Sequence, residues 1–495
     1  MLRGCENILK TISGIKRGFI LFLLVYIIYN LNMRTINSGD TWPASMLPFA
    51  ILSQRTLYLD MYSNFFQSLD FTPHMVVLSE GHYLSLYPIV IPVLLTPLYV
   101  IPYLLLNQLH FPLDMLNTSF YLLVFIIEKL FASLIAATSV VFCFLAWKEL
   151  IRRKIAFLCA GIYAFATNTW ATSSQALWQH GMVELILSIL IFLIIINEKK
   201  RSDRKIILMG LLSGFFIFNR PSDSLLMLPV LVYAFHLGKR LFLYYMACGA
   251  LSGFPFLSYN LIFFHNAFGG YAGHLSEFTL GSSFLVNISG LLFSPGRGLL
   301  IYSPILLLSL IGFMRIKDID TRNLRLFFYA AGISILLELI VYGSFRVWWA
   351  GNCYGPRFLV CLMPYLVTYI GLYLNRWLHL GRIHRKDILS LCLIAAILIW
   401  SVFAQMVGVF FYPNGNWDGT PQPVDLSPNR LWDWSDNPIS RCLHSGPIIV
   451  NPFKIFSFLS ENDSHKVIDE TNRSIGWSKL NNEGIIGGLK GYDRD

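Results

Sequence analysis

Long apolar runs alternate with short polar connections along most of this chain. A membrane-spanning helix needs about 20 predominantly apolar residues. Runs that reach or approach this length lie at residues 18–33, 119–147, 155–173, 182–197, 241–264, 299–314, 326–343, 358–374 and 388–411. The pattern predicts an all-α polytopic membrane protein over residues 1–411, followed by a polar extension over residues 412–495.

Two further apolar segments each allow two interpretations. Residues 83–105 are apolar enough to span a bilayer, but four prolines interrupt them, and proline breaks the helical hydrogen-bond ladder. We therefore expect juxtamembrane or re-entrant helices within one large external loop, residues 34–118. Residues 206–237 are interrupted by Asn219-Arg220-Pro221-Ser222-Asp223 and are predicted to form a hairpin of two short helices. These choices give about eleven transmembrane helices.

The basic residues orient this bundle, because cytoplasmic loops of membrane proteins carry an excess of Lys and Arg. Six of the 38 Lys and Arg residues lie in the predicted external loops. Another 23 lie in segments that we predict to be cytoplasmic, residues 1–17, 148–154, 199–205, 239–240, 315–325 and 376–386. The N-terminus is then cytoplasmic and the C-terminal extension lies outside. We expect an integral protein of the bacterial inner (plasma) membrane.

Composition excludes several classes of protein. Only 13% of the residues are charged, against about 25% in soluble proteins. The net charge of +10 comes from short clusters between apolar runs, so it does not indicate a nucleic-acid partner. The eight cysteines show no C-x-x-C spacing and most lie inside apolar runs, so they signal neither a metal site nor a disulfide framework.

Two carboxylates stand out among the polar residues that fall on the predicted outer side. Asp40 follows the first apolar run directly, in the turn Ser38-Gly39-Asp40, and Glu80 lies in the segment Glu80-Gly81-His82-Tyr83. Such a pair suits catalysis, because one carboxylate can take a proton from a hydroxyl while the other orients the acceptor or binds a metal. Asp40 is the leading candidate, and the alternative for it is a polar stop to the helix.

Arginines near the predicted helix ends form a second set of candidates. Arg220, Arg297 and Arg357 lie beside Gly or Pro in external loops, where a guanidinium can hold a phosphate with two hydrogen bonds. Each of them alone could instead pair with a neighbouring carboxylate. Together they indicate an anionic ligand.

Aromatic and histidine side chains complete the predicted site. Those that could contact a sugar or lipid substrate are His82, Tyr83, Trp178, His180, Trp349 and Tyr354. The alternative for the aromatic residues is the belt at the membrane interface, and His180 could also serve as an acid or base or be structural. Within the predicted spans, Glu128, Lys129 and Glu338 are interpreted as helix-packing partners, with a proton relay as the alternative.

In combination, these residues resemble the GT-C superfamily of membrane glycosyltransferases. The likeness is greatest to the branch of protein O-mannosyltransferases and lipid A aminoarabinose transferases, and it covers residues 1 to about 411. It rests on Asp40 after the first span, on the Pro-rich first external loop, and on the external motifs. These motifs are Trp178-Gln179-His180-Gly181, Arg220-Pro221, Ser294-Pro295-Gly296-Arg297-Gly298 and Tyr354-Gly355-Pro356-Arg357. Pro88-Ile89-Val90 departs from the Pro-x-Gly of the family.

The resemblance implies a GT-C-like fold and an extracytoplasmic hexosyl- or pentosyltransferase. The donor would carry its sugar on a polyprenyl phosphate, and the acceptor would be a glycan, a lipid or a protein. Asp40 matches the general base of the family, and the external arginines would hold the departing phosphate. A divalent metal is possible, but the resemblance does not establish a need for one, because members with monophosphate donors often need none. The rival hypotheses are a transporter or flippase of a lipid-linked sugar, a glycan ligase or polymerase, and a noncatalytic scaffold.

Overall fold

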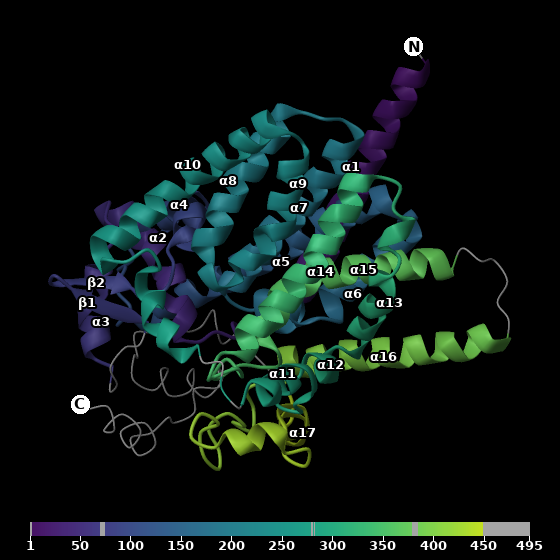
Figure 1. The fold of residues 1–495 in the computed structure, drawn as a ribbon. Helices are drawn as coiled ribbons and strands as arrows, with labels where there is room; N and C mark the ends of the chain where they lie inside the picture. The colour runs from purple at the N-terminus through teal and green to yellow at the C-terminus, as the bar shows by residue number, and fades with distance from the viewer. Residues whose placement is uncertain (1, 70–74, 279–280, 282, 379–384, 449–495) are drawn as a thin grey trace.

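The computed structural model of the chain describes residues 2–69, 75–278, 281, 283–378 and 385–448. Within these ranges the chain folds as a bundle of helices with one short β-hairpin (Figure 1). The segment between the first two long helices contains α2 (Trp42–Gln54), α3 (Ser63–Gln67), β1 (Val76–Ser79), β2 (His82–Ser85) and α4 (Val90–Gln108). The other helices are α1 (Leu2–Asn30), α5 (Thr118–Leu150), α6 (Arg153–Phe165), α7 (Gln179–Lys199), α8 (Asp203–Asn219), α9 (Leu228–His236), α10 (Lys239–Phe264), α11 (Phe284–Phe293), α12 (Leu299–Tyr302), α13 (Leu308–Phe313), α14 (Arg322–Gly343), α15 (Met363–Trp377), α16 (Arg385–Phe410) and α17 (Pro438–Ser445).

Seven helices in the described ranges are long and apolar enough to cross a membrane, so the chain is an all-α integral membrane protein. They are α4, α5, α7, α10, α14, α15 with the 3₁₀ turn before it, and most of α16. The predicted hairpin over residues 206–237 is built from α8, a 3₁₀ turn at Pro221–Met227, and α9. Pro304 divides the predicted span over residues 299–314, because proline cannot continue a helix there. The count of eleven spans stays a prediction.

The prolines of the first external loop do not break its helix, and this part of the prediction was wrong. α4 runs without interruption over 19 residues and contains Pro97 and Pro102. Each proline removes one backbone N–H donor, so one backbone carbonyl loses its helical partner. In membrane proteins, neighbouring groups can satisfy such a carbonyl. The hydroxyl of Thr96 donates to the carbonyl of Pro92 at 2.7 Å. α4 also packs along α2.

α4 is long and apolar enough to span a bilayer, and its place within an external loop stays a prediction. α5 has 33 residues, about 50 Å at 1.5 Å per residue. From Glu128, which binds Asn37 after α1, to Glu149 at the other end is about 32 Å, close to the thickness of the hydrocarbon core. The first turns of α5 therefore extend beyond that core. α4 starts beside this same end of the bundle and leads into these turns.

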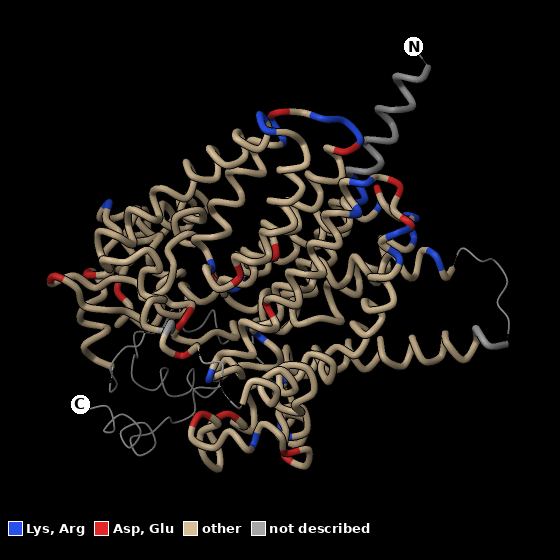
Figure 2. The backbone as a smooth tube through the Cα atoms, in the orientation of Figure 1, with Lys and Arg blue, Asp and Glu red and all other residues tan. Residues whose placement is uncertain are grey.

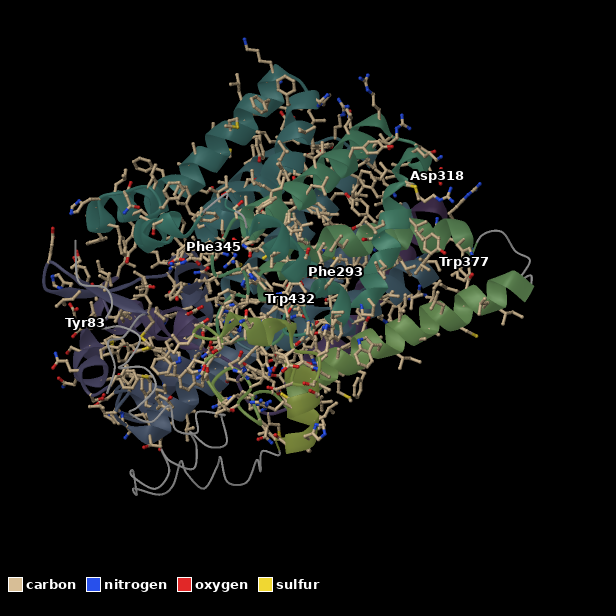
Figure 3. The ribbon with its side chains drawn as sticks, turned by 60° about the horizontal axis from the view of Figure 1, so that its bottom comes forward. Tyr83, Phe293, Asp318, Phe345, Trp377 and Trp432 are labelled. Atoms are coloured by element: carbon tan, nitrogen blue, oxygen red, sulfur yellow. The ribbon has the colours of Figure 1, made fainter. Side chains whose placement is uncertain are left out.

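The connections predicted to be cytoplasmic meet at one end of the bundle. Lys199 at the end of α7 pairs with Glu149 of α5, and the guanidinium of Arg152 donates to the backbone oxygen of Asn375 at 2.9 Å. Figure 2 shows the Lys- and Arg-rich connections gathered at one side of the molecule. In Figure 3, Asp318 and Trp377 lie toward one edge and Tyr83 of the first loop lies at the opposite edge. The bundle thus has a basic end and a second end formed by the other loops.

Candidate active site

The loop that carries Asp40 is fixed at the second end of the bundle. Asn37 donates to the buried carboxylate of Glu128 at 3.0 Å, and the hydroxyl of Ser38 caps the 3₁₀ turn at the backbone N–H of Asp40. Pro43 at the start of α2 then suits the first turn of a helix, where no backbone donor is needed. Asp40 therefore lies on a short, anchored turn between two helices.

Asp40 contacts a cation and a phenol from distant parts of the chain. Its Oδ2 accepts from Nη1 of Arg357 at 3.0 Å, and its Oδ1 accepts from the hydroxyl of Tyr87 at 2.7 Å. The side chain of Asp40 is 26% exposed and that of Arg357 is 11% exposed. The guanidinium of Arg357 also lies 4.5 Å from the centre of the Trp178 ring and donates to the carbonyl of Ala350 at 2.7 Å. The result is a partly exposed carboxylate bounded by a positioned guanidinium.

Tyr87 stays protonated and therefore keeps donating a hydrogen bond to the carboxylate of Asp40. It lies between β2 and α4, directly before Pro88. Burial, and next the carboxylate of Asp40, raise the pKa of Tyr87 well above its usual range. Its ring contacts that of Tyr271 at 6.1 Å between centroids. Burial raises the pKa of Tyr271 to about 12, and its hydroxyl donates to Oε1 of Gln179. Both phenols are therefore neutral at physiological pH.

A second charged group surrounds Arg220 between α8 and α9. Nε of Arg220 donates to Oδ1 of Asp223 at 3.0 Å, and Nη2 donates to the hydroxyl of Tyr342 at 3.0 Å. Nη1 reaches Oε1 of Gln179 at 3.4 Å. Gln179 at the start of α7 therefore links Arg220 to Tyr271, whose ring contacts Tyr87 beside Asp40. Arg220 is itself buried and paired, so it borders the site and is not free in it.

Arg297 lies in a buried contact with the C-terminal extension. Its side chain is 1% exposed and forms a buried ion pair with Asp418 of the C-terminal extension. The guanidinium also donates to the carbonyls of Trp349, Gly296 and Gly351 at 2.9 to 3.1 Å. These contacts use four of its five N–H groups, so a role of Arg297 in binding phosphate stays a prediction. Arg297 fixes the extension to the loop before α15.

Two of the predicted substrate-binding aromatic residues belong to the same structural contact. The indole Nε1 of Trp349 donates to Oδ1 of Asp425 in the extension at 2.6 Å. The hydroxyl of Tyr354 donates to the carbonyl of Ala404 in α16 at 2.7 Å, and its ring packs on Tyr302. Both side chains are buried. They shape the loop that carries Arg357, and their contact with a substrate stays a prediction.

The predicted residues of the β-hairpin form a cluster of their own. Glu80 lies at its exposed tip, where positive φ angles of 51° at Glu80 and 85° at Gly81 make a two-residue turn. His82 binds Asp60 at 2.6 Å and stacks on Tyr58. The contacts of Asp40 described above are with Tyr87 and Arg357, and the pairing of Asp40 with Glu80 in catalysis stays a prediction.

The remaining predicted residues divide between the site and its support. Trp178 lies at the site, under the guanidinium of Arg357. His180 is buried, and its Nδ1 lies 3.3 Å from the sulfur of Cys361. Sequence reasoning missed Tyr87 and Tyr271, because an isolated tyrosine in a loop carries no signal. Gln179 lies inside the motif Trp178-Gln179-His180-Gly181, but the sequence alone indicates no role for it.

The helix-packing interpretation of Glu128 and Lys129 agrees with their contacts. Glu128 holds the Asp40 loop through Asn37 and accepts from the backbone N–H of Leu177 at 3.1 Å. Nζ of Lys129 donates to the carbonyl of Ser174 at 2.9 Å. Both residues therefore fasten the loops on either side of the site to α5. In contrast, the carboxylate oxygens of Glu338 have no hydrogen-bond partner within the described ranges.

Comparison with known proteins gives a distant likeness to solved structures. No protein-family model matches the chain, and no curated protein matches it. The chain is similar to the crystal structure of the oligosaccharyltransferase of Archaeoglobus fulgidus, which is tethered to an acceptor peptide containing the NVT sequon. The TM-score is 0.47 at 11% sequence identity, over 84% of this chain and 58% of that chain. The chain thus spans little more than half the length of that enzyme, and the match assigns no activity to it.

Proposed function

We propose that the chain is a membrane glycosyltransferase that moves a sugar from a polyprenyl-phosphate donor to an acceptor hydroxyl on the extracytoplasmic face. The observation that carries this proposal is the ion pair between Asp40 and Arg357. It places a partly exposed carboxylate and a positioned guanidinium at one end of a membrane bundle. A lipid-linked anionic donor reaches a site at this position from the bilayer, and a polar acceptor reaches it from water.

In the proposed reaction, Asp40 accepts the proton of the acceptor hydroxyl. The hydroxyl oxygen forms a bond to the anomeric carbon as the bond from that carbon to the phosphate oxygen breaks. The leaving group is the polyprenyl phosphate, whose charge a guanidinium can stabilise. Arg357 suits this task, because it is held by Trp178 and Ala350 as well as by Asp40.

The ion pair itself suggests how donor binding prepares the base. A phosphate that binds Arg357 competes with Asp40 for the same guanidinium, because both are anions that accept its N–H groups. When the guanidinium of Arg357 binds the phosphate instead of the carboxylate, Oδ2 of Asp40 can accept the proton of the acceptor hydroxyl. Tyr87 keeps its hydrogen bond to Oδ1 and so maintains the orientation of the carboxylate.

The experiment that tests the function uses the full-length chain in detergent. A panel of radiolabelled polyprenyl-phosphate sugars is supplied with a crude acceptor extract, and label that leaves the lipid fraction is measured. Detergent removes the closed compartments that a transporter needs, so label in a water-soluble or protein fraction reports group transfer. We expect one donor class to be consumed. Intact donor throughout the panel, together with donor movement in reconstituted vesicles, would identify a transporter instead.

A further inference from the structure

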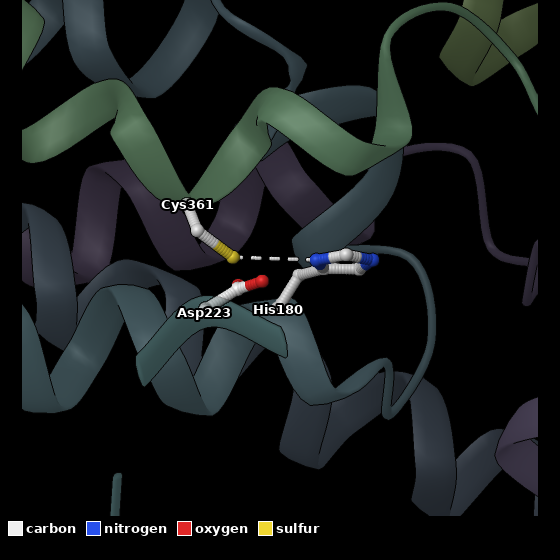
Figure 4. A group of neighbouring side chains, drawn as sticks. All are labelled: His180, Asp223 and Cys361. Carbon is white, nitrogen blue, oxygen red and sulfur yellow. Dashed lines mark hydrogen bonds between the residues drawn. The ribbon is translucent and has the colours of Figure 1, made fainter. Parts of the chain in front are cut away.

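Three buried side chains near the site bring together ligand atoms typical of a transition-metal centre. His180 comes from the first turn of α7, Asp223 from the 3₁₀ turn after α8, and Cys361 from the 3₁₀ turn before α15 (Figure 4). Their potential ligand atoms all lie within 4.8 Å of one another. The side chains are 2%, 1% and 1% exposed, respectively. Figure 4 shows the imidazole and the thiol directed at each other with the carboxylate beside them.

The two carboxylate oxygens of Asp223 have different surroundings. Its Oδ1 accepts from Nε of Arg220 at 3.0 Å, from the hydroxyl of Ser222 at 3.2 Å, and from the hydroxyl of Tyr342. Its Oδ2 is buried, and the thiol of Cys361 interacts with Asp223 by a hydrogen bond. A metal ion that replaces this thiol proton would bind the sulfur and the carboxylate together. Partners that hold the second oxygen of a metal-binding carboxylate are typical of such sites.

The charges around the cluster allow a divalent cation despite the nearby guanidinium. Glu338 of α14 interacts electrostatically with Asp223 and Arg220, and both of its oxygens lack hydrogen-bond partners within the described ranges. With Cys361 as a thiolate, Cys361 and Asp223 carry two negative charges, which match the charge of one divalent cation. The charge of Arg357 is matched by Asp40.

We propose that His180, Asp223 and Cys361 bind one divalent cation of the zinc class. Zinc prefers thiolate, imidazole and carboxylate ligands, whereas magnesium and calcium prefer oxygen ligands alone. Zinc–nitrogen and zinc–sulfur bonds in a tetrahedral site place the two ligand atoms about 3.5 Å apart. The observed separation of Nδ1 of His180 from the sulfur of Cys361 is 3.3 Å. Binding displaces the thiol proton of Cys361 to solvent, and three protein ligands leave a fourth position for water.

A cation bound at this position would also stabilise the surrounding structure. It joins three segments that are separate in the chain, and Cys361 shares its 3₁₀ turn with Arg357. A bound cation therefore fixes the turn that presents Arg357 to Asp40. This inference concerns metal binding and holds whether or not the chain transfers a sugar.

The test measures zinc binding by the purified full-length chain in detergent, without any activity assay. Zinc content is determined after removal of excess metal, and affinity is determined against a competing chelator. We expect about one zinc per chain. Cys361→Ser should lower the affinity at least about tenfold. Cys143→Ser is the matched control, because Cys143 is also buried but contacts Ser188 within the bundle. Equal affinity of Cys361→Ser and Cys143→Ser, or no zinc in the wild type, would overturn the proposal.

A second measurement uses the wild-type chain alone, in case Cys361→Ser does not fold. Cobalt replaces zinc in sites of this kind, and a cobalt–thiolate bond gives a characteristic charge-transfer absorption. We expect this absorption when the chain is titrated with Co²⁺ and its loss when Zn²⁺ is added. A titration that produces no such band excludes Cys361 as a ligand.

Discussion

Asp40 and Arg357 are 317 residues apart in the chain, and their side chains form an ion pair at 3.0 Å. The pair joins the loop after α1 to the loop before α15, so it is a product of the tertiary fold. Glu128 fixes the first loop, and Arg297 with Asp418 fixes the second. Much of the buried polar structure at this end of the bundle serves to hold these two side chains in contact.

Replacement of Arg357 should impair donor use. Arg357→Lys keeps the charge but loses the planar group that stacks on Trp178 and bonds two oxygens at once. We expect kcat/KM for the donor to fall about 100-fold, as for the loss of one group that stabilises a leaving oxyanion. Arg346→Lys is the control, because Arg346 is exposed and pairs with Glu277 at 3.1 Å. Similar kinetics of the two variants would remove Arg357 from the proposed reaction.

Tyr87→Phe should lower kcat with little effect on folding. The change removes one hydrogen bond to a carboxylate, which is worth about 1.5 to 3 kcal/mol, and we expect a rate loss of about tenfold or more. Tyr244→Phe is the control, because Tyr244 is exposed and accepts a hydrogen bond from Arg240 at the basic end of the bundle. Unchanged kcat in Tyr87→Phe would show that Asp40 does not need this donor.

The pH dependence should not contain the ionisation of Tyr87. Its folded pKa is raised, so the phenol stays neutral below that value and keeps donating to Asp40. An unperturbed tyrosine ionises near pH 10. We expect any alkaline loss of activity up to about pH 9 to be the same in the wild type and in Tyr87→Phe. An alkaline limb that disappears in the variant would contradict the assignment.

Arg297→Met should destabilise the chain without acting through a phosphate site. Removal of one partner leaves Asp418 as a buried unpaired charge, which costs about 3 to 5 kcal/mol. Arg346→Met removes an exposed pair worth less than about 1 kcal/mol. Thermal unfolding in detergent should therefore distinguish the two variants clearly. Equal midpoints, with a selective loss of donor affinity in Arg297→Met, would place Arg297 in the phosphate site.

The location of α4 can be tested by cysteine labelling. Leu109 follows α4 and is exposed, and Leu426 is exposed in the C-terminal extension. If α4 stays at the outer surface, Leu109→Cys and Leu426→Cys react with a membrane-impermeant thiol reagent added outside intact cells. Lys154→Cys at the basic end should react only after permeabilisation. Protection of Leu109→Cys in intact cells would show that α4 crosses the bilayer. The unmodified chain measures the background.

The sequence was informative where short-range pattern determines structure. Apolar runs predicted the long helices, and the turn after the first run pointed to Asp40. Local pattern could not separate the arginines, because Arg297 and Arg357 both lie beside Gly or Pro in tight loops. Their contacts differ, because Arg297 forms an ion pair with Asp418 and Arg357 forms one with Asp40. Both ion pairs depend on how loops that are distant in the sequence pack together.

Two other features of the structure that the sequence did not predict also depend on tertiary packing. Proline is a helix breaker in water, but α4 continues through Pro97 and Pro102 where packing against α2 compensates. Cys361 lies in an apolar run without any spaced cysteine partner, so a ligand role was invisible in the sequence. It became visible when the fold placed Cys361 beside His180 and Asp223.

The most direct test of the central claim is the rate of sugar transfer by Asp40→Asn. The purified variant is compared with the wild type and with Asp114→Asn, which changes an exposed aspartate of the same loop. Loss of a general base should lower the rate about 100- to 10,000-fold, while Asp114→Asn stays near the wild-type rate and all three chains unfold at similar temperatures. Transfer by Asp40→Asn at the wild-type rate would contradict the account.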